Sequence, residues 1–144
     1  GGAGFSILAA LHYWFPKITG RMYSEKYAKL GWLNLFVGFN FLYFSMFILG
    51  FQGMPRRYFD YPSHYHMNHV ISTVGSWFLA FGLAVIFTNL IRSVFKGEKA
   101  PINPWRGRTL EWTLPSPPAH RNFLETPVIT QGPYPYDEEA AGQK

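Results

Sequence analysis

Two long uncharged segments dominate the pattern of hydrophobic and polar positions along the chain. No Asp, Glu, Lys or Arg occurs in residues 30–55 or in residues 70–91, and both segments are rich in Phe, Leu, Ile and Val. A helix needs about 20 apolar residues to cross the ~30 Å hydrocarbon core of a bilayer. Each segment is long enough, so the pattern predicts two transmembrane helices.

The other segments complete the predicted organisation. Residues 1–16 are uncharged but short for a membrane span, and Pro16 is expected to stop their helix. A helix that begins part-way across a membrane predicts a piece of a longer polypeptide. Eight prolines after residue 100 favour an extended tail. The predicted parts are the second half of a transmembrane helix (1–16), a loop (17–27), a transmembrane helix (28–51), a second loop (52–67), the last transmembrane helix (68–95) and a proline-rich tail (96–144).

Three glycines and an asparagine give further expectations about a turn and about helix packing. Gly20 is expected to form a turn in the first loop. Gly31, Gly38 and Asn40 interrupt the first long apolar segment. Small residues allow helices to approach closely, and an amide can form a hydrogen bond across helices. The segment is therefore predicted to pack in a helix bundle.

The basic residues indicate how the helices are oriented. Nine Lys or Arg lie in residues 17–29 and 92–108, which share one side because two crossings separate them, whereas two lie in residues 56–69. Loops on the cytoplasmic side of a membrane carry an excess of Lys and Arg. We therefore expect the first loop and the tail to be cytoplasmic and the second loop to face outward.

Composition narrows the function classes. Of the 144 residues, 48% are apolar and 15% are charged, which is little charge for a soluble domain. The isoelectric point of about 9.6 does not indicate nucleic-acid binding, because the basic clusters flank the apolar segments. The chain has no cysteine, which excludes disulfides, thiolate metal sites and a cysteine nucleophile.

An adjacent arginine pair is the strongest candidate for chemistry. Arg56 and Arg57 lie on the side where basic residues are disfavoured. One interpretation is that they extend to the membrane surface with Asp60 as counter-ion. The other is an anion site, because two guanidiniums in a proline-stiffened turn, flanked by Tyr58 and Tyr61, suit paired carboxylates or phosphates. The pattern alone leaves both interpretations open.

Histidines near the same loop raise a separate hypothesis. His64, His66 and His69 follow an HxHxxH spacing, and with His12 and His120 they could suggest a copper or zinc site. No carboxylate or cysteine joins them. We therefore interpret them as interfacial polar residues and predict no metal site, and whether they bind anything stays open.

Motifs that occur in order from residue 13 to about 128 carry a resemblance to a known family. They are WFPKITGRM (14–22), GMPRRY with DYP (53–58, 60–62), STVGS (72–76), and NPW with TLEWTLPSPP (103–105, 109–118). With these motifs the chain resembles the C-terminal part of cytochrome c oxidase subunit I, of the haem-copper oxidase superfamily, in its bacterial form. It departs from the family in residues 43–50, YFSMFILG, which lack the proline and histidine of the family's FFPxHFLG.

The resemblance implies an all-α transmembrane fold. The helices would be the C-terminal helices of a twelve-helix bundle, followed by an extended cytoplasmic tail. Arg56 and Arg57 would bind the propionates of haem a and haem a3, and Tyr58 and Asp60 would support them. The whole complex would hold both haems and copper on ligands upstream of this chain, which would contact the propionates only.

The resemblance also implies a function. The chain would be part of the catalytic subunit of a proton-pumping terminal oxidase that reduces oxygen to water, with cytochrome c favoured as donor by the intact MPRRY sequence. Its partners would be the N-terminal remainder of subunit I, subunits II and III, cytochrome c, membrane lipid and a larger respiratory supercomplex. It would lie in the bacterial inner membrane as a multi-pass protein. The alternatives are a non-catalytic membrane assembly subunit whose arginines bind lipid headgroups, and a nitric oxide reductase, which shares the fold but lacks the PRRY loop.

Overall fold

The computed structural model describes residues 1–123 and 127–128 of the chain. The described residues form helices and connecting segments without a β-strand, which confirms the predicted all-helical class. They pack as two units. The first unit contains Ser24–Phe95 together with Gly1, and the second contains Gly2–Tyr23 and the described residues after Phe95.

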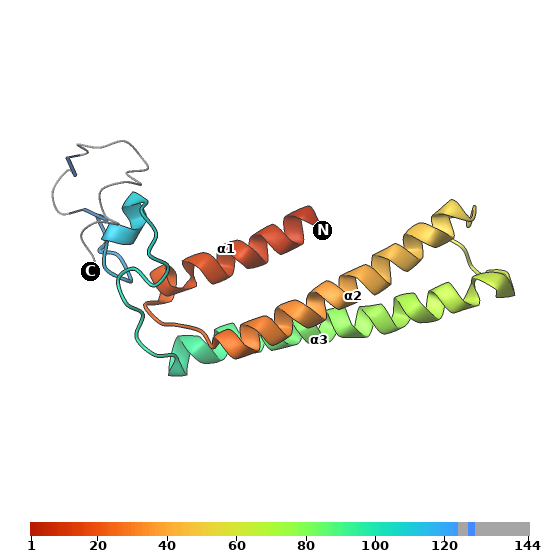
Figure 1. Cartoon of the computed structure of the whole chain (residues 1–144), viewed down its shortest axis with the longest axis horizontal. Helices are drawn as coiled ribbons and strands as arrows, with labels where there is room; N and C mark the ends of the chain where they lie inside the picture. Colours follow the sequence, from red (N-terminus) through yellow and green to blue (C-terminus); the bar gives the residue numbers. More distant parts are fainter. Residues whose placement is uncertain (124–126, 129–144) are drawn as a thin grey trace, which may run out of the picture. The chain divides into compact units, whose positions relative to one another are not determined.

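The first unit is a hairpin of two long helices. Helix α2 (Glu25–Phe51) and helix α3 (His66–Lys96) run side by side in opposite directions (Figure 1). Both are long and apolar enough to cross a membrane. They begin at Glu25 and His66 rather than at the predicted residues 28 and 68. The extra turn of α2 is polar, and an ion pair of 2.8 Å between Glu25 and Lys29 supports it. Counting apolar residues alone therefore underestimates the length of the helix.

Small residues line the surface where α2 and α3 meet. The four glycines of this surface, here called the glycine seam, are Gly31, Gly38, Gly75 and Gly82. A Cβ atom added to Gly38 would lie 2.4 Å from the backbone nitrogen of Leu79, and one added to Gly75 would lie 2.5 Å from that of Leu42. The two backbones are therefore in direct contact, as small residues permit between membrane helices.

The glycine seam repeats every seven residues. The next positions in the repeat, Ser45 on α2 and Asn89 on α3, are also buried. A seven-residue repeat keeps one narrow stripe of each helix against its partner over the whole length. Large side chains outside the stripe, such as Phe47 and Trp77, stay exposed. This arrangement suits helices whose outer surfaces meet lipid or neighbouring helices.

Asn89 joins α3 to the start of α2. Its side-chain oxygen accepts a hydrogen bond from the backbone N–H of Ser24 at 3.2 Å, and its amide nitrogen donates to the Ser24 carbonyl at 2.9 Å. Ser24 is the N-cap residue of α2, and its own side chain makes no capping bond. The neighbouring helix thus satisfies a backbone N–H that would otherwise lack a partner at the helix end. Asn40, the amide expected to bridge helices, instead donates to Phe36 within α2.

The second unit begins with helix α1 (Gly2–Thr19). The expectation that Pro16 stops this helix is wrong, because the helix continues through a buried Pro16 to Thr19. Proline removes its own N–H bond, but the turn that follows it is closed in other ways. The N–H of Gly20 donates to the Pro16 carbonyl at 2.9 Å, and the Thr19 hydroxyl donates to the Phe15 carbonyl at 2.8 Å. Gly20, with φ of 69°, forms the predicted turn and ends the helix.

The described part of the predicted tail packs against α1. Trp112, in the short 3-10 helix η2 (Leu110–Thr113), is 1% exposed, and its indole N–H donates to the Tyr13 hydroxyl at 2.8 Å. The Trp105 indole donates to the Tyr13 carbonyl at 2.9 Å. Indole rings gain most from burial with a partner for the N–H, and α1 supplies both. Residues 124–126 and 129–144 of the predicted tail lie outside the described part of the chain.

Lys17 helps to hold the tail against α1. Its ammonium group donates to the carbonyl oxygens of Leu114 at 2.7 Å and Ile102 at 3.4 Å, and it lies 4.9 Å from the ring centre of Trp112. The side chain is only 7% exposed. Burial lowers the pKa of Lys17, and the carboxylate of Glu111 partly opposes this shift. The lysine therefore acts as a buried donor for carbonyl groups that the irregular tail leaves without backbone partners.

The glycine seam predicts opposite effects for the same substitution at two sites. Gly38→Ala places a methyl group against the backbone of α3 and is expected to destabilise the hairpin by about 1–3 kcal/mol, as overpacking does. Gly4→Ala, on α1, meets nothing within 4 Å and is expected to be neutral or slightly stabilising. The thermal unfolding midpoint of the intact membrane protein that contains this chain measures both effects. Equal midpoints would contradict a backbone contact at Gly38.

The hydrogen bonds of Lys17 lead to a prediction about how strongly the tail is held against α1. Lys17→Met keeps the side-chain length but removes both bonds to carbonyl groups, so trypsin should cleave after Arg106 and Arg108 about tenfold faster in the intact protein. Lys26→Met, at an exposed position on α2, is the matched control and should leave the cleavage rate unchanged. An equal rate in both variants would show that Lys17 does not hold the tail.

Candidate functional site

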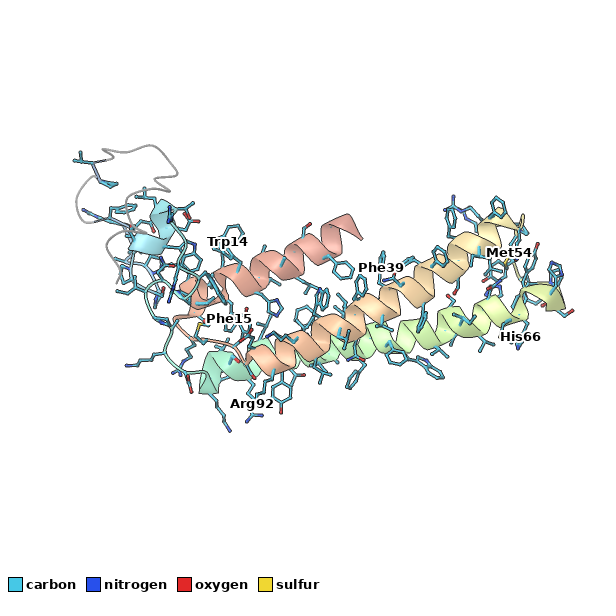
Figure 2. The ribbon with its side chains drawn as sticks, in the orientation of Figure 1. Trp14, Phe15, Phe39, Met54, His66 and Arg92 are labelled. Atoms are coloured by element: carbon cyan, nitrogen blue, oxygen red, sulfur yellow. The ribbon has the colours of Figure 1, made fainter. Side chains whose placement is uncertain are left out.

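The arginine pair lies in the loop that joins α2 to α3. The loop proper covers residues 52–62, because a 3-10 turn, η1 (Ser63–Tyr65), and the start of α3 occupy the rest of the predicted segment. The last turn of α2 closes with bonds from Gln52 to the Ile48 carbonyl at 2.9 Å and from Met54 to the Leu49 carbonyl at 3.1 Å. Met54 and His66 mark this end of the hairpin, opposite Arg92 (Figure 2).

Two residues set the path of the loop. Gly53 has φ of 82°, a conformation that glycine adopts without steric cost, and it turns the chain out of the helix. Tyr65 is buried, and its hydroxyl donates to the Gln52 carbonyl at 3.1 Å. The second contact ties the end of the loop to its beginning. The arginines are thus carried on a short segment that is fixed at both ends.

Both guanidinium groups of the pair are exposed and available. Among the described residues, neither Arg56 nor Arg57 has a hydrogen-bond or ion-pair partner, and Asp60 instead accepts a bond from the backbone N–H of Tyr61 at 2.8 Å. The interpretation of Asp60 as direct counter-ion of the pair therefore finds no support. Arg57 has φ of 59°, which is uncommon for a residue other than glycine.

The arginine pair borders a pocket of about 340 Å³. One wall is apolar and comes from the last turns of α2, where Met46, Leu49 and Gly50 share a face. The other walls are the loop from Met54 to Tyr58 and, from α3, His69. A pocket with an apolar wall and two unpaired guanidiniums fits a ligand that combines an apolar body with carboxylates. The residues present therefore suit the propionate side of a haem.

Tyr58, Tyr61 and two histidines brace the loop against α3. The Tyr58 hydroxyl lies 3.4 Å from Nδ1 of His69, and the Tyr61 hydroxyl lies 3.3 Å from Nδ1 of His66. The Tyr61 ring also lies over His69, with ring centres 4.1 Å apart. Tyr58 was predicted to support the arginines, and it does line their pocket. His69 and the apolar wall were not predicted, although Met46, Leu49 and Gly50 follow the i, i+3, i+4 spacing that marks one helix face.

The histidines do not assemble into a metal centre in the described chain. His66 and His69 lie beside tyrosine hydroxyls, while the ring of His64 lies against that of Tyr65 at a tilt of 51°, with ring centres 3.9 Å apart. His12 lies on α1, where its Nδ1 is 2.7 Å from the Leu8 carbonyl. Within residues 1–123 and 127–128 no three His, Asp or Glu side chains are grouped so as to hold a metal ion.

Comparison with known proteins identifies the family. The family described as cytochrome c and quinol oxidase polypeptide I matches residues 1–104. The chain belongs to this family. It is 42% identical over 136 residues to cytochrome c oxidase subunit 1 of Synechocystis, covering 94% of this chain and 25% of the relative. It is also 42% identical over 132 residues to cytochrome c oxidase subunit 1 of Bacillus sp. PS3, covering 90% and 21%.

A third relative also matches most of this chain. The heme-copper oxidase subunit I+III of Aeropyrum pernix is 38% identical over 131 residues, covering 90% of this chain and 16% of the relative. The chain thus spans a quarter or less of the length of these curated relatives. The part matched by the oxidase family includes both long helices and the arginine loop. The predicted resemblance to oxidase subunit I is confirmed.

Proposed function

We propose that this chain is part of the catalytic subunit of a proton-pumping terminal oxidase that reduces oxygen to water with electrons from cytochrome c. Within that subunit, Arg56 and Arg57 bind the propionates of haem a and haem a3. The observation that carries the proposal is the pocket beside the loop, where two guanidiniums with no anionic partner among the described residues meet an apolar wall. The relatives that match the chain are oxidase subunits, which supports the same function.

The arginines contribute charge and geometry. A guanidinium presents two parallel N–H donors to a carboxylate, so the pair can hold two carboxylates in fixed orientations. Opposite charge within about 4–6 Å favours the ionised carboxylate, and the propionates would therefore stay charged or release protons readily. The haems and copper, when bound through the rest of the subunit, supply electron transfer and oxygen chemistry. Tyr58 and Asp60 support the loop and do not take part in the chemistry.

The remaining partners follow from the family. The chain completes a twelve-helix bundle with the N-terminal remainder of subunit I and meets subunits II and III, cytochrome c and membrane lipid, with a larger respiratory supercomplex as a further setting. The family includes quinol oxidases as well as cytochrome c oxidases. The intact MPRRY sequence of residues 54–58 favours cytochrome c as donor.

The charge distribution supports a location in the bacterial inner membrane, with the arginine loop outside and the tail in the cytoplasm. Nine basic residues in segments 17–29 and 92–108 against two in residues 56–69 follow the positive-inside rule. Cysteines replacing Ser63 and Lys96, both exposed, should react with a membrane-impermeant reagent from opposite faces of sealed vesicles. Labelling of both from one face would reject this topology.

Substitution of one arginine tests the propionate assignment. Arg57→Leu would leave a propionate without its counter-charge in a partly dry site, at a cost of about 2–5 kcal/mol by analogy with broken buried ion pairs. The uncompensated negative charge should stabilise ferric iron and lower the haem potential. Arg57→Lys keeps the charge but loses the planar fork, so its effect should be smaller and fall on proton handling.

Redox titration of both haems together with the proton-pumping ratio measures these effects in the intact oxidase. Arg92→Leu, which removes an exposed guanidinium at the opposite end of α3, is the matched control and should leave the potentials unchanged. If both Arg57 variants keep wild-type potentials and pumping, the propionate assignment is wrong. The result would then favour the alternative in which the pair binds lipid headgroups, because a headgroup is remote from the iron.

A further inference from the structure

A second groove lies along the hairpin, away from the arginine loop. It has a volume of about 390 Å³ and follows the side of α3 next to Tyr27 of α2. Phe81, Ala84, Val85, Thr88 and Arg92 form its floor. Their spacing of three, four and seven residues places them on one face of α3. The groove therefore runs along the helix and has a distinct apolar end and charged end.

The charged end lies where the apolar part of the hairpin stops. Arg92 is the first charged residue after the uncharged residues 70–91, and Tyr27 precedes the uncharged residues 30–55. Since α2 and α3 are antiparallel, both side chains lie at the same end of the hairpin. This level corresponds to the boundary between hydrocarbon and headgroups, where tyrosine and basic residues concentrate. Phe81 and Ala84 lie two to three turns deeper.

Neither polar group at this end has a partner in the described chain. Arg92 is exposed and has no hydrogen bond or ion pair, and the hydroxyl of the half-exposed Tyr27 has none either. The nearby Lys29, by contrast, is paired with Glu25 at 2.8 Å. A free guanidinium beside a phenol suits a phosphate group, which both can bind as hydrogen-bond donors. The groove thus offers an anion site that leads directly into an apolar channel.

We propose that this groove binds a phospholipid with an anionic headgroup. Arg92 and Tyr27 bind its phosphate, and one acyl chain lies along Thr88, Val85, Ala84 and Phe81. Anionic lipids are attracted to basic segments next to a membrane, and Tyr27 and Arg92 come from the two segments, 17–29 and 92–108, that together hold nine basic residues. The site is independent of the haem propionate assignment, since it lies at the opposite end of α3 from the arginine loop (Figure 2).

Lipid titration of the purified, delipidated oxidase complex tests the headgroup contact. Native mass spectrometry with dioleoylphosphatidylglycerol and, separately, dioleoylphosphatidylcholine measures the affinity for each. Arg92→Gln should weaken phosphatidylglycerol binding about five- to tenfold. It should weaken phosphatidylcholine binding less, because the choline cation already offsets the charge of that phosphate and opposes the wild-type guanidinium. Lys96→Gln removes an exposed charge one turn further along α3, outside the groove, and should have little effect. Equal affinities in wild type and Arg92→Gln would overturn the proposal.

Photo-crosslinking identifies what occupies the groove in the assembled complex. With p-benzoylphenylalanine in place of Thr88, irradiation in phosphatidylglycerol vesicles should give a lipid adduct on α3. An adduct to another polypeptide segment would show that a neighbouring helix fills the groove and would overturn the proposal. Ala84→Phe should fill the apolar channel and abolish binding of both lipids, whereas unchanged binding in this variant would show that the acyl chain lies elsewhere.

Discussion

The direct backbone contact between α2 and α3 is the constraint on which the rest of the hairpin depends. Gly38, Gly75 and Gly82 bring the two main chains into direct contact, and Gly31 leaves room for the side chain of Ile86. In a membrane, where apolar side chains gain little from leaving lipid, such close packing is the main source of association. The contact aligns the helix ends, and the two candidate binding surfaces lie at those ends: the arginine loop at one and the Arg92 groove at the other.

The arginines at the two ends of the hairpin lie in different backbone surroundings. At the loop end, the guanidiniums of Arg56 and Arg57 are carried on a turn that is tied down by Tyr65 and braced by tyrosine–histidine contacts. At the other end, Arg92 projects from a regular helix beside an apolar groove. A pair on a fixed loop suits carboxylates held in set orientations, whereas a single exposed arginine beside an apolar groove suits an amphiphile. The difference follows from backbone context, since the side-chain chemistry is the same.

Much of this architecture could be predicted from the sequence, and the exceptions have physical reasons. Uncharged length predicted both long helices, because the hydrocarbon thickness fixes the number of apolar residues. The seven-residue repeat of small residues was missed, since Gly31 and Gly38 look like isolated interruptions until their partners on the other helix are known. Asn40 was expected to bridge helices, but it faces outward, and the amide that bridges is Asn89. The sequence shows where the amide side chains lie along the chain, but not which face of a helix each of them occupies.

For the candidate site and the tail, too, the sequence predicts important residues but not the contacts that they make. The arginine pair was evident from its position on the sparsely charged side of the membrane, whereas the pocket wall of Met46 and Leu49 depends on which face of α2 lies beneath the loop. In the tail, the prolines suggested an extended chain, but Trp112 and Lys17 supply burial and hydrogen bonds that hold it against α1. Proline content describes local backbone preference, and long-range contacts determined the outcome here.

The seven-residue spacing of the glycine seam also favours one register of the hairpin. Moving α2 along α3 by one residue would separate Gly38 from the backbone of Leu79 and Gly75 from that of Leu42, so the close approach of the two main chains would be lost. We therefore expect the arginine loop to move together with both helices rather than by one helix sliding past the other.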